Sequence, residues 1–202
     1  QGVEVKRYST VAYAKAQWDL QAVDYRAERA DLTDALAPFG AELATAVWSV
    51  RFFEPGEKEE WTLSWLPQDT SLYRVQHVLP EDAAGADLTE QEAQAIAHQA
   101  LIDLGIDPSF LERKDVSSEK LENRRDHWFA WETPEGNRLR IEESRLRYDV
   151  HIAGDAVADI HRSIKLPEEW LRERRESTLW RTALSWIPRA SIAIVVLHML
   201  WL

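Results

Sequence analysis

The stretch "VWSVRFFEPGEKEEWTLSWL" (47–66) decides the fold of this chain. Apolar side chains occupy every second position on either side of a central turn, as in strands that bury one face. These positions are Trp48, Val50, Phe52, Trp61, Leu63 and Trp65. The intervening "EPGEKEE" (54–60) combines a Pro-Gly turn with charges that keep a hairpin tip in water. The pattern therefore predicts two antiparallel strands joined by a hairpin.

Further strand patterns lie on both sides of this hairpin. Residues 5–18 and 72–79 predict one strand each, and residues 147–152 and 156–166 predict a second hairpin about Ala153-Gly154-Asp155. In its last strand the apolar residues are expected to face inward: Ala158, Ile160, Ile164 and Leu166. Arg162 interrupts that apolar face, and we expect it at the edge of the face with its charged end in water.

The clearest helix covers residues 89–104, "TEQEAQAIAHQALIDL". Thr89 and Glu92 have the spacing of a capping box, in which each side chain satisfies a backbone amide at the start of a helix. A single apolar stripe follows at helical spacing: Ala93, Ile96, Ala97, Ala100, Leu101 and Leu104. Gly105 and Pro108 end the helix. Residues 20–37 predict a second, short polar helix.

The two halves of the chain share short sequence echoes. "HVLPED" (77–82) resembles "IKLPEE" (164–169), and "ADLTD" (30–34) resembles "ADLTE" (86–90). We predict an α+β fold of two related units, residues 1–82 and 83–167, each a helix packed on an antiparallel sheet. The first unit lacks an opening helix, and the N-terminus has neither an initiator Met nor a signal-peptide pattern, so we expect a piece cut upstream of Gln1.

Composition excludes several classes of function. The net charge of −11 argues against a general nucleic-acid binder, because such proteins need a basic surface to displace phosphate counterions. The absence of cysteine removes disulfide frameworks, zinc ribbons and thiol nucleophiles.

We find no residues in a pattern that indicates chemistry. The six histidines lie at positions 77, 98, 127, 151, 161 and 198, without the spacing of a metal site. There is no Gly-x-Ser-x-Gly elbow and no phosphate-binding glycine loop. "ENRRDHW" (122–128) mixes charges of both signs and predicts a solvated loop. The sequence therefore predicts no catalytic, cofactor-binding or metal-binding residue within residues 1–202.

The C-terminal part changes character. Residues 168–189 predict a charged connecting helix whose glutamates lie at its positive N-terminal end. Residues 190–202 are apolar apart from Ser191 and His198, and Trp180 and Trp186 precede them as membrane-interface anchors do. A bilayer crossing needs about 20 apolar residues, so we predict the start of a transmembrane helix. An amphipathic surface helix is the alternative, and the arginines leave the sidedness open.

Two segments carry a resemblance to a known family. Residues 48–97 and 148–177, with "AGDAVADIHRSIKLPEEW" as the most specific part, resemble the region that precedes the membrane core in bacterial CPBP-type (CAAX protease and bacteriocin-processing) intramembrane metalloproteases. The resemblance implies tandem PepSY-like α+β modules outside the bilayer. It places a catalytic Glu-Glu-x-x-x-Arg motif, and histidines for a divalent metal such as zinc, on later membrane helices. Glu168-Glu169 does not fit that motif, because Glu173 stands where the arginine is required.

These expectations define a function for the segment. It would be a non-catalytic extracytoplasmic domain that presents substrate to a membrane protease or restrains it. Its expected partners are the lipid bilayer, the membrane core of the protease and extended peptides, which exposed sheet edges can accept. One alternative is a single-pass, membrane-anchored PepSY-like binding or inhibitory module without a catalytic partner in the chain. Another is a soluble enzyme with a buried C-terminal helix.

Overall fold

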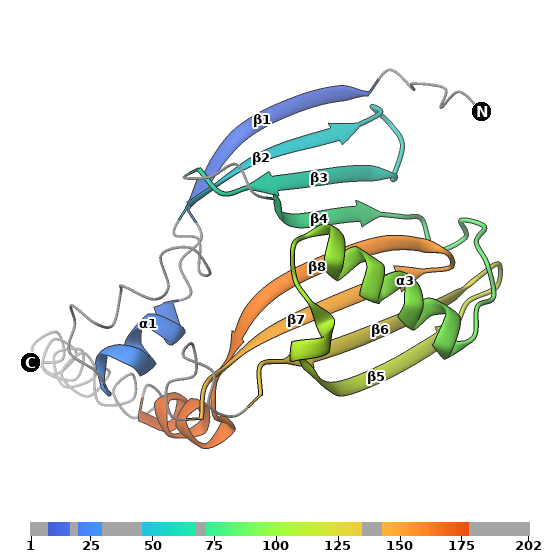
Figure 1. Cartoon of the computed structure of the whole chain (residues 1–202). Coiled ribbons are helices and arrows are strands. Elements are labelled where there is room, and N and C mark those ends of the chain that lie inside the picture. The colour runs from blue at the N-terminus through green and yellow to red at the C-terminus, as the bar shows by residue number, and fades with distance from the viewer. Residues whose placement is uncertain (1–7, 17–19, 30–45, 68–71, 135–142, 178–202) are drawn as a thin grey trace, which may run out of the picture. The chain divides into compact units, whose positions relative to one another are not determined.

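The computed structural model describes residues 8–16, 20–29, 46–67, 72–134 and 143–177. The chain divides into two compact units, residues 1–165 and 166–202. The first unit is dominated by one eight-stranded antiparallel sheet with the strand order β1-β2-β3-β4-β8-β7-β6-β5 (Figure 1). The predicted α+β class is confirmed at this level.

Along the chain, the strands of the first unit form two sets of four, β1–β4 and β5–β8, with α3 between the two sets. The elements in order are β1 (Ser9–Ala16), α1 (Leu20–Ala27), β2 (Ala46–Phe53), β3 (Glu60–Trp65), β4 (Leu72–Val78), α3 (Glu90–Asp103), the 3₁₀ turn η2 (Pro108–Phe110), β5 (Glu112–Lys120), β6 (Arg125–Glu132), β7 (Arg145–Ala153) and β8 (Ala156–Lys165). Both predicted hairpins and the strand over 72–79 are confirmed. The predicted strand over 5–18 is present as β1, and α1 begins the predicted helix over 20–37, whose part beyond residue 29 lies outside the described residues.

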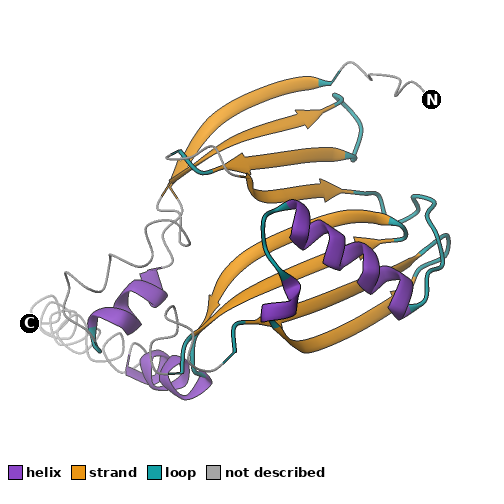
Figure 2. Ribbon diagram, in the orientation of Figure 1, coloured by secondary structure: helices purple, strands orange, loops and turns teal. Residues whose placement is uncertain are grey.

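Helix α3 forms as its sequence predicts and covers one face of the sheet (Figure 2). The capping box is complete: the Thr89 N–H donates to Glu92 Oε2 at 2.9 Å, and the Glu92 N–H donates to Thr89 Oγ1 at 3.4 Å. Its buried stripe consists of Ala93, Ala97, Ala100 and Leu101. These side chains pack on a layer from β6, β7 and β8 made of Phe129, Trp131, Leu146, Tyr148, Val150, Ile152 and Ile160. This contact forms the main hydrophobic core.

The prediction of a solvated loop over residues 122–128 is wrong. Only the turn before Arg125 is outside the sheet, and β6 continues to Glu132. Asp126 and His127 point to opposite faces, yet both are buried, because Arg124 pairs with Asp126 and α3 lies over the face of His127. A strand that buries both faces has no polar-apolar alternation, so its charged residues resembled those of a loop.

Arg162 is half-buried on the same face as Ile160, and its Nε is buried without a hydrogen-bond partner among the described residues, so the prediction that its charged end lies in water is not confirmed. Strand β8 lies in the middle of the sheet, between β4 and β7. The Arg162 guanidinium carbon lies 5.7 Å from the ring centre of Tyr73 and 5.6 Å from that of Tyr148. The arginine therefore reaches two aromatic rings within the sheet, which compensates part of the cost of placing its charge there.

Strands β1–β4 and β5–β8 repeat the same arrangement in the same register. Val50 pairs with Leu63 in the first half, and Phe129 pairs with Val150 in the second. The third and fourth strands of each half contain a bulge at the equivalent place, at Ser64/Trp65 and at His151/Ile152. The halves meet where Val75 of β4 pairs with its own equivalent, Ile160 of β8. The sheet thus has an approximate two-fold axis at this pair, while the division into domains 1–82 and 83–167 stays a prediction.

The second unit is described only at its beginning. Residues 168–177 are helical, the Leu171 N–H donates to the carbonyl oxygen of Pro167 at 3.1 Å, and the Arg174 guanidinium carbon lies 5.4 Å from the Trp170 ring centre. The predicted transmembrane start at 190–202 lies outside the described residues. Within the described part of the chain, no helix has the length and hydropathy needed to cross a bilayer.

Candidate functional site

The two edge strands of the sheet, β1 and β5, differ in their chemistry. Every residue of both strands is exposed, and an edge strand presents unpaired N–H and C=O groups to which another strand can add. Strand β5 reads ERKDVSSEK, so it carries charges along most of its length. Strand β1 reads STVAYAKA and carries a single charge, on Lys15. Charges protect an edge from pairing, so β5 is blocked and β1 is open.

The side chains on β1 leave room for an added strand. Ala12 and Ala14 pair with Val50 and Trp48 of β2, and paired residues project to the same face of the sheet. Trp48 is 55% exposed, so a large ring stands beside the small side chains of the edge. On the other face, Val11 is 48% exposed. Side chains of an added strand could therefore contact apolar surface on both faces.

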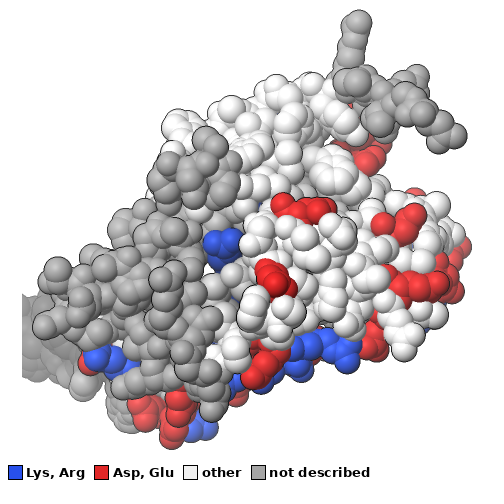
Figure 3. Space-filling view, viewed as in Figure 1, with Lys and Arg blue, Asp and Glu red and all other residues white. Residues whose placement is uncertain are grey.

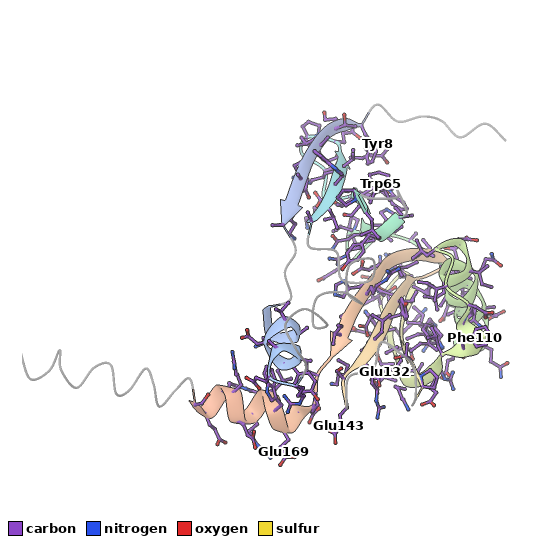
Figure 4. All side chains as sticks on the ribbon, turned by 60° about the vertical axis from the view of Figure 1, so that its left-hand side comes forward. Tyr8, Trp65, Phe110, Glu132, Glu143 and Glu169 are labelled. Atoms are coloured by element: carbon purple, nitrogen blue, oxygen red, sulfur yellow. The ribbon has the colours of Figure 1, made fainter. Side chains whose placement is uncertain are left out.

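On the sheet face seen in Figure 3 the surface around β1 is largely uncharged, whereas on the other face the Arg51–Glu60 ion pair lies beside Val11. In Figure 3 the part of the surface over β1–β4 is mostly free of charged atoms, whereas acidic and basic atoms line the side of β5. Figure 4 shows Tyr8 at the beginning of β1 and Trp65 on β3 in the same half of the sheet. Lys15 has no ion-pair partner among the described residues, so it could pair with a carboxylate of a bound peptide.

A second candidate is a shallow depression of about 250 Å³ on the sheet face opposite α3. Its lining includes Asp115, Ser117, Trp128, Arg147, His151 and Asp159. The Arg147 guanidinium donates to Asp149 Oδ1 at 2.8 Å, to Asp115 Oδ2 at 2.9 Å and to Glu132 Oε1 at 3.2 Å, and Glu132 is labelled in Figure 4. These three carboxylates already accept hydrogen bonds from the Arg147 guanidinium and balance its charge, so Arg147 is poorly placed to bind an anionic ligand.

His151 is the titratable group of this depression. Its ring stacks on Trp128 with 4.5 Å between ring centres, and its Nε2 lies 3.5 Å from Asp126 Oδ2. Burial lowers the pKa of His151, against the opposing effect of the Asp126 charge. Asp126 is itself held by Arg124, and no hydrogen bond joins His151 to Ser117 among the described residues. The geometry therefore does not assemble a nucleophile with a general base.

The remaining histidines are spread over separate environments. His77 stacks on Trp61 with 3.6 Å between ring centres, and its Nε2 lies 2.9 Å from Glu59 Oε1. The His127 Nε2–H donates to the Leu88 carbonyl oxygen at 3.0 Å. His198 lies outside the described residues. In the ranges that the structure describes, no three histidine or carboxylate side chains gather as metal ligands would.

We expect the chain to lose stability as the pH falls from 7.5 to 5. Burial lowers the pKa of His151 and of His161 below the ordinary value of 6.5, and the Arg74 charge adds to this effect at His161. At acidic pH the unfolded chain then binds more protons than the folded chain. The free energy of unfolding is therefore at its full value above pH 6.5 and falls as the pH drops below 6.5. Urea denaturation at both pH values measures this. A His151→Gln/His161→Gln variant should lose most of the dependence, and an unchanged slope would contradict the assignment.

The sequence pattern did not single out the polar cluster around Arg147. Charged or polar side chains alternate with apolar ones in residues 145–151, and this alternation predicts a strand but not which neighbours its polar side chains contact. The cluster arises because β5, β6 and β7 bring Asp115, Glu132 and Arg147 side by side. Comparisons of this chain with protein-family models, with curated proteins and with solved structures found no match.

Proposed function

We propose that this chain is the non-catalytic, extracytoplasmic part of a membrane-embedded CPBP-type intramembrane metalloprotease. Its role is to present substrates to the protease or to restrain it, and it does so by binding an extended peptide along β1. The observation that carries the proposal is the contrast between an open edge at β1 and a charged, blocked edge at β5.

Strand addition suits the requirements of such a domain. Backbone hydrogen bonds supply affinity without regard to sequence, and alternate side chains supply selectivity. Strand β1 has eight residues and no proline, so its outer N–H and C=O groups form an unbroken row. Because β5 is blocked, growth of the sheet is restricted to one side, which limits aggregation through its edges.

The internal repeat supports the PepSY-like part of the proposal. Tandem modules would give two similar four-stranded halves, as in β1–β4 and β5–β8. Helix α3 precedes the second half, whereas α1 lies between the first two strands of the first half. The helix over 168–177 would lead toward the predicted membrane segment at 190–202. The proposal assigns a divalent metal, such as zinc, only to a membrane core that would follow.

A single-pass, membrane-anchored binding or inhibitory module is the second candidate, because strand addition at β1 needs no catalytic partner. The polypeptide after Leu202 distinguishes the two candidates. Several further apolar spans with a Glu-Glu-x-x-x-Arg motif would favour the protease. In such a protease, deletion of residues 1–167 should change the cleavage of at least one substrate, and unchanged cleavage of every tested substrate would contradict the proposed role.

A matched pair of edge variants tests peptide binding. Val11 on β1 and Val116 on β5 are 48% and 40% exposed, so lysine at either position should leave the fold intact. The probe is a fluorescent nonapeptide of alternating valine and threonine with aspartate at one end. We expect Val11→Lys to weaken its binding at least about tenfold in fluorescence anisotropy, since a charge blocks an edge, and Val116→Lys to leave it unchanged. Equal effects of the two variants would contradict binding at β1.

A further inference from the structure

Six side chains of β2 and β3 form an apolar layer that we call the aromatic face. It consists of Trp48, Val50, Phe52, Trp61, Leu63 and Trp65. The pairing register places this layer on the same side of the sheet as α3. Val50 pairs with Leu63, Leu63 with Val75, and Val75 with Ile160, which lies in the core beneath α3. Paired residues project to one face, so the aromatic face continues the surface that α3 covers.

Each residue of the aromatic face has an equivalent in the second half of the sheet. The equivalent pairs are Trp48 and His127, Val50 and Phe129, Phe52 and Trp131, Trp61 and Tyr148, Leu63 and Val150, and Trp65 and Ile152. All six members in the second half are buried beneath α3 or beside it. None of the six in the first half reaches that burial, and Trp48 remains 55% exposed. The same surface is thus buried in one half of the sheet, whereas in the other half five of its six side chains are only half-buried and Trp48 is exposed.

The described helices do not account for this difference. Helix α3 packs on β6, β7 and β8, and none of the helices within the described ranges packs extensively on β2 or β3. Trp48 is exposed and the other five side chains are half-buried, and a contiguous, partly exposed apolar layer of this kind typically marks an interaction site. None of its six residues carries a formal charge, which suits an apolar partner surface.

We infer that the aromatic face is a docking surface for an amphipathic α-helix of a partner polypeptide, with small side chains along its contact stripe. The geometry of α3 specifies this occupant. Its alanines let the helix backbone approach large side chains such as Phe129 and Trp131, and the aromatic face likewise carries large rings, with three tryptophans where the second half has one. Its interface continues across the β4–β8 pair into the aromatic face, so a second helix would extend an existing packed layer.

The α3 sequence supplies the probe. A synthetic peptide of residues 86–105, which includes the capping box and the terminal glycine, is added to the 202-residue chain. We expect saturable binding, a gain of helical circular dichroism and a blue shift of tryptophan fluorescence. A peptide with Ala93→Leu and Ala97→Leu has a bulky stripe and should bind at least about tenfold more weakly, because it cannot approach the rings closely.

Two exposed tryptophans provide matched variants of the chain. Trp48 lies on the aromatic face, whereas Trp128 lies on the opposite face and is 37% exposed. Trp48→Ala should weaken binding of the peptide at least about tenfold, as truncation of an aromatic anchor does, and Trp128→Ala should leave the binding unchanged. Absence of binding, or equal loss in both variants, would overturn the inference. The chain could instead self-associate through this surface. Self-association that is abolished by Trp48→Ala and is not displaced by the peptide would overturn the inference and identify a second copy of the chain as the occupant.

Discussion

Arg124→Ala should lower the free energy of unfolding by about 3–5 kcal/mol, because it leaves a buried carboxylate without its counter-charge. Arg124 and Asp126 are only 4% and 3% exposed. The guanidinium donates to Asp126 Oδ1 at 2.8 Å and Oδ2 at 3.3 Å, and also to the carbonyl oxygens of Pro80 and Ala83 at 2.7 and 2.9 Å. It therefore ties the segment before α3 to the first residues of β6. Urea denaturation at pH 7.5 measures the loss.

The double variant Arg124→Met/Asp126→Leu distinguishes the contribution of the Arg124–Asp126 ion pair to stability from the contribution of side-chain packing at these positions. Removal of both charges leaves no unpaired ion, so the double variant should be more stable than Arg124→Ala or Asp126→Ala alone. It should not regain the full stability of the parent, because the carbonyl groups of Pro80 and Ala83 lose their donor. Losses that simply add in the double variant would show that the two side chains are not coupled.

Trp131→Ala should cost about 3–5 kcal/mol of unfolding free energy, as truncation of a large buried aromatic side chain does. Trp131 is 2% exposed and lies beneath α3, with its ring centre 5.6 Å from that of Phe129 and 5.4 Å from that of His98. Removal of the indole opens a cavity that the rigid sheet cannot close. Thermal and urea denaturation should agree on the size of the loss.

Trp48→Ala is the control, because Trp48 is a tryptophan on the same face of the sheet in the first half and is 55% exposed. Its side chain is largely in water already, so we expect a loss of about 1 kcal/mol or less. If Trp48→Ala were as destabilising as Trp131→Ala, the aromatic face would belong to a packed core. That result would also remove the basis for helix docking at this surface.

Local patterns in the sequence were sufficient for most individual elements. Alternation predicted β2, β3, β7 and β8, and the capping box with its apolar stripe predicted α3. Strand β6 was missed, because Arg124 neutralises Asp126 inside the sheet and the strand buries both of its faces. Strand β5 was missed because both of its faces are exposed and charged. Neither strand has the one-sided burial that alternation detects.

The candidate site depends on contacts that no local pattern contains. Val75 and Ile160 are far apart in the sequence, yet their pairing joins the halves and makes β1 and β5 the two outer strands. Only this strand order distinguishes an edge strand from an interior strand. The sequence therefore predicts that the sheet has exposed edges, but it does not show that β1 forms one of them.

Peptide N-methylation tests the central claim, strand addition at β1, most directly. An added strand directs only alternate backbone N–H groups toward its neighbour. Two versions of the valine-threonine nonapeptide, N-methylated at odd or at even positions, therefore have the same side chains but block opposite edges. We predict that the 202-residue chain binds one version as it binds the unmodified peptide, and that it loses affinity for the other at least about tenfold. Equal binding of all three peptides, or binding of none, would contradict strand addition at β1.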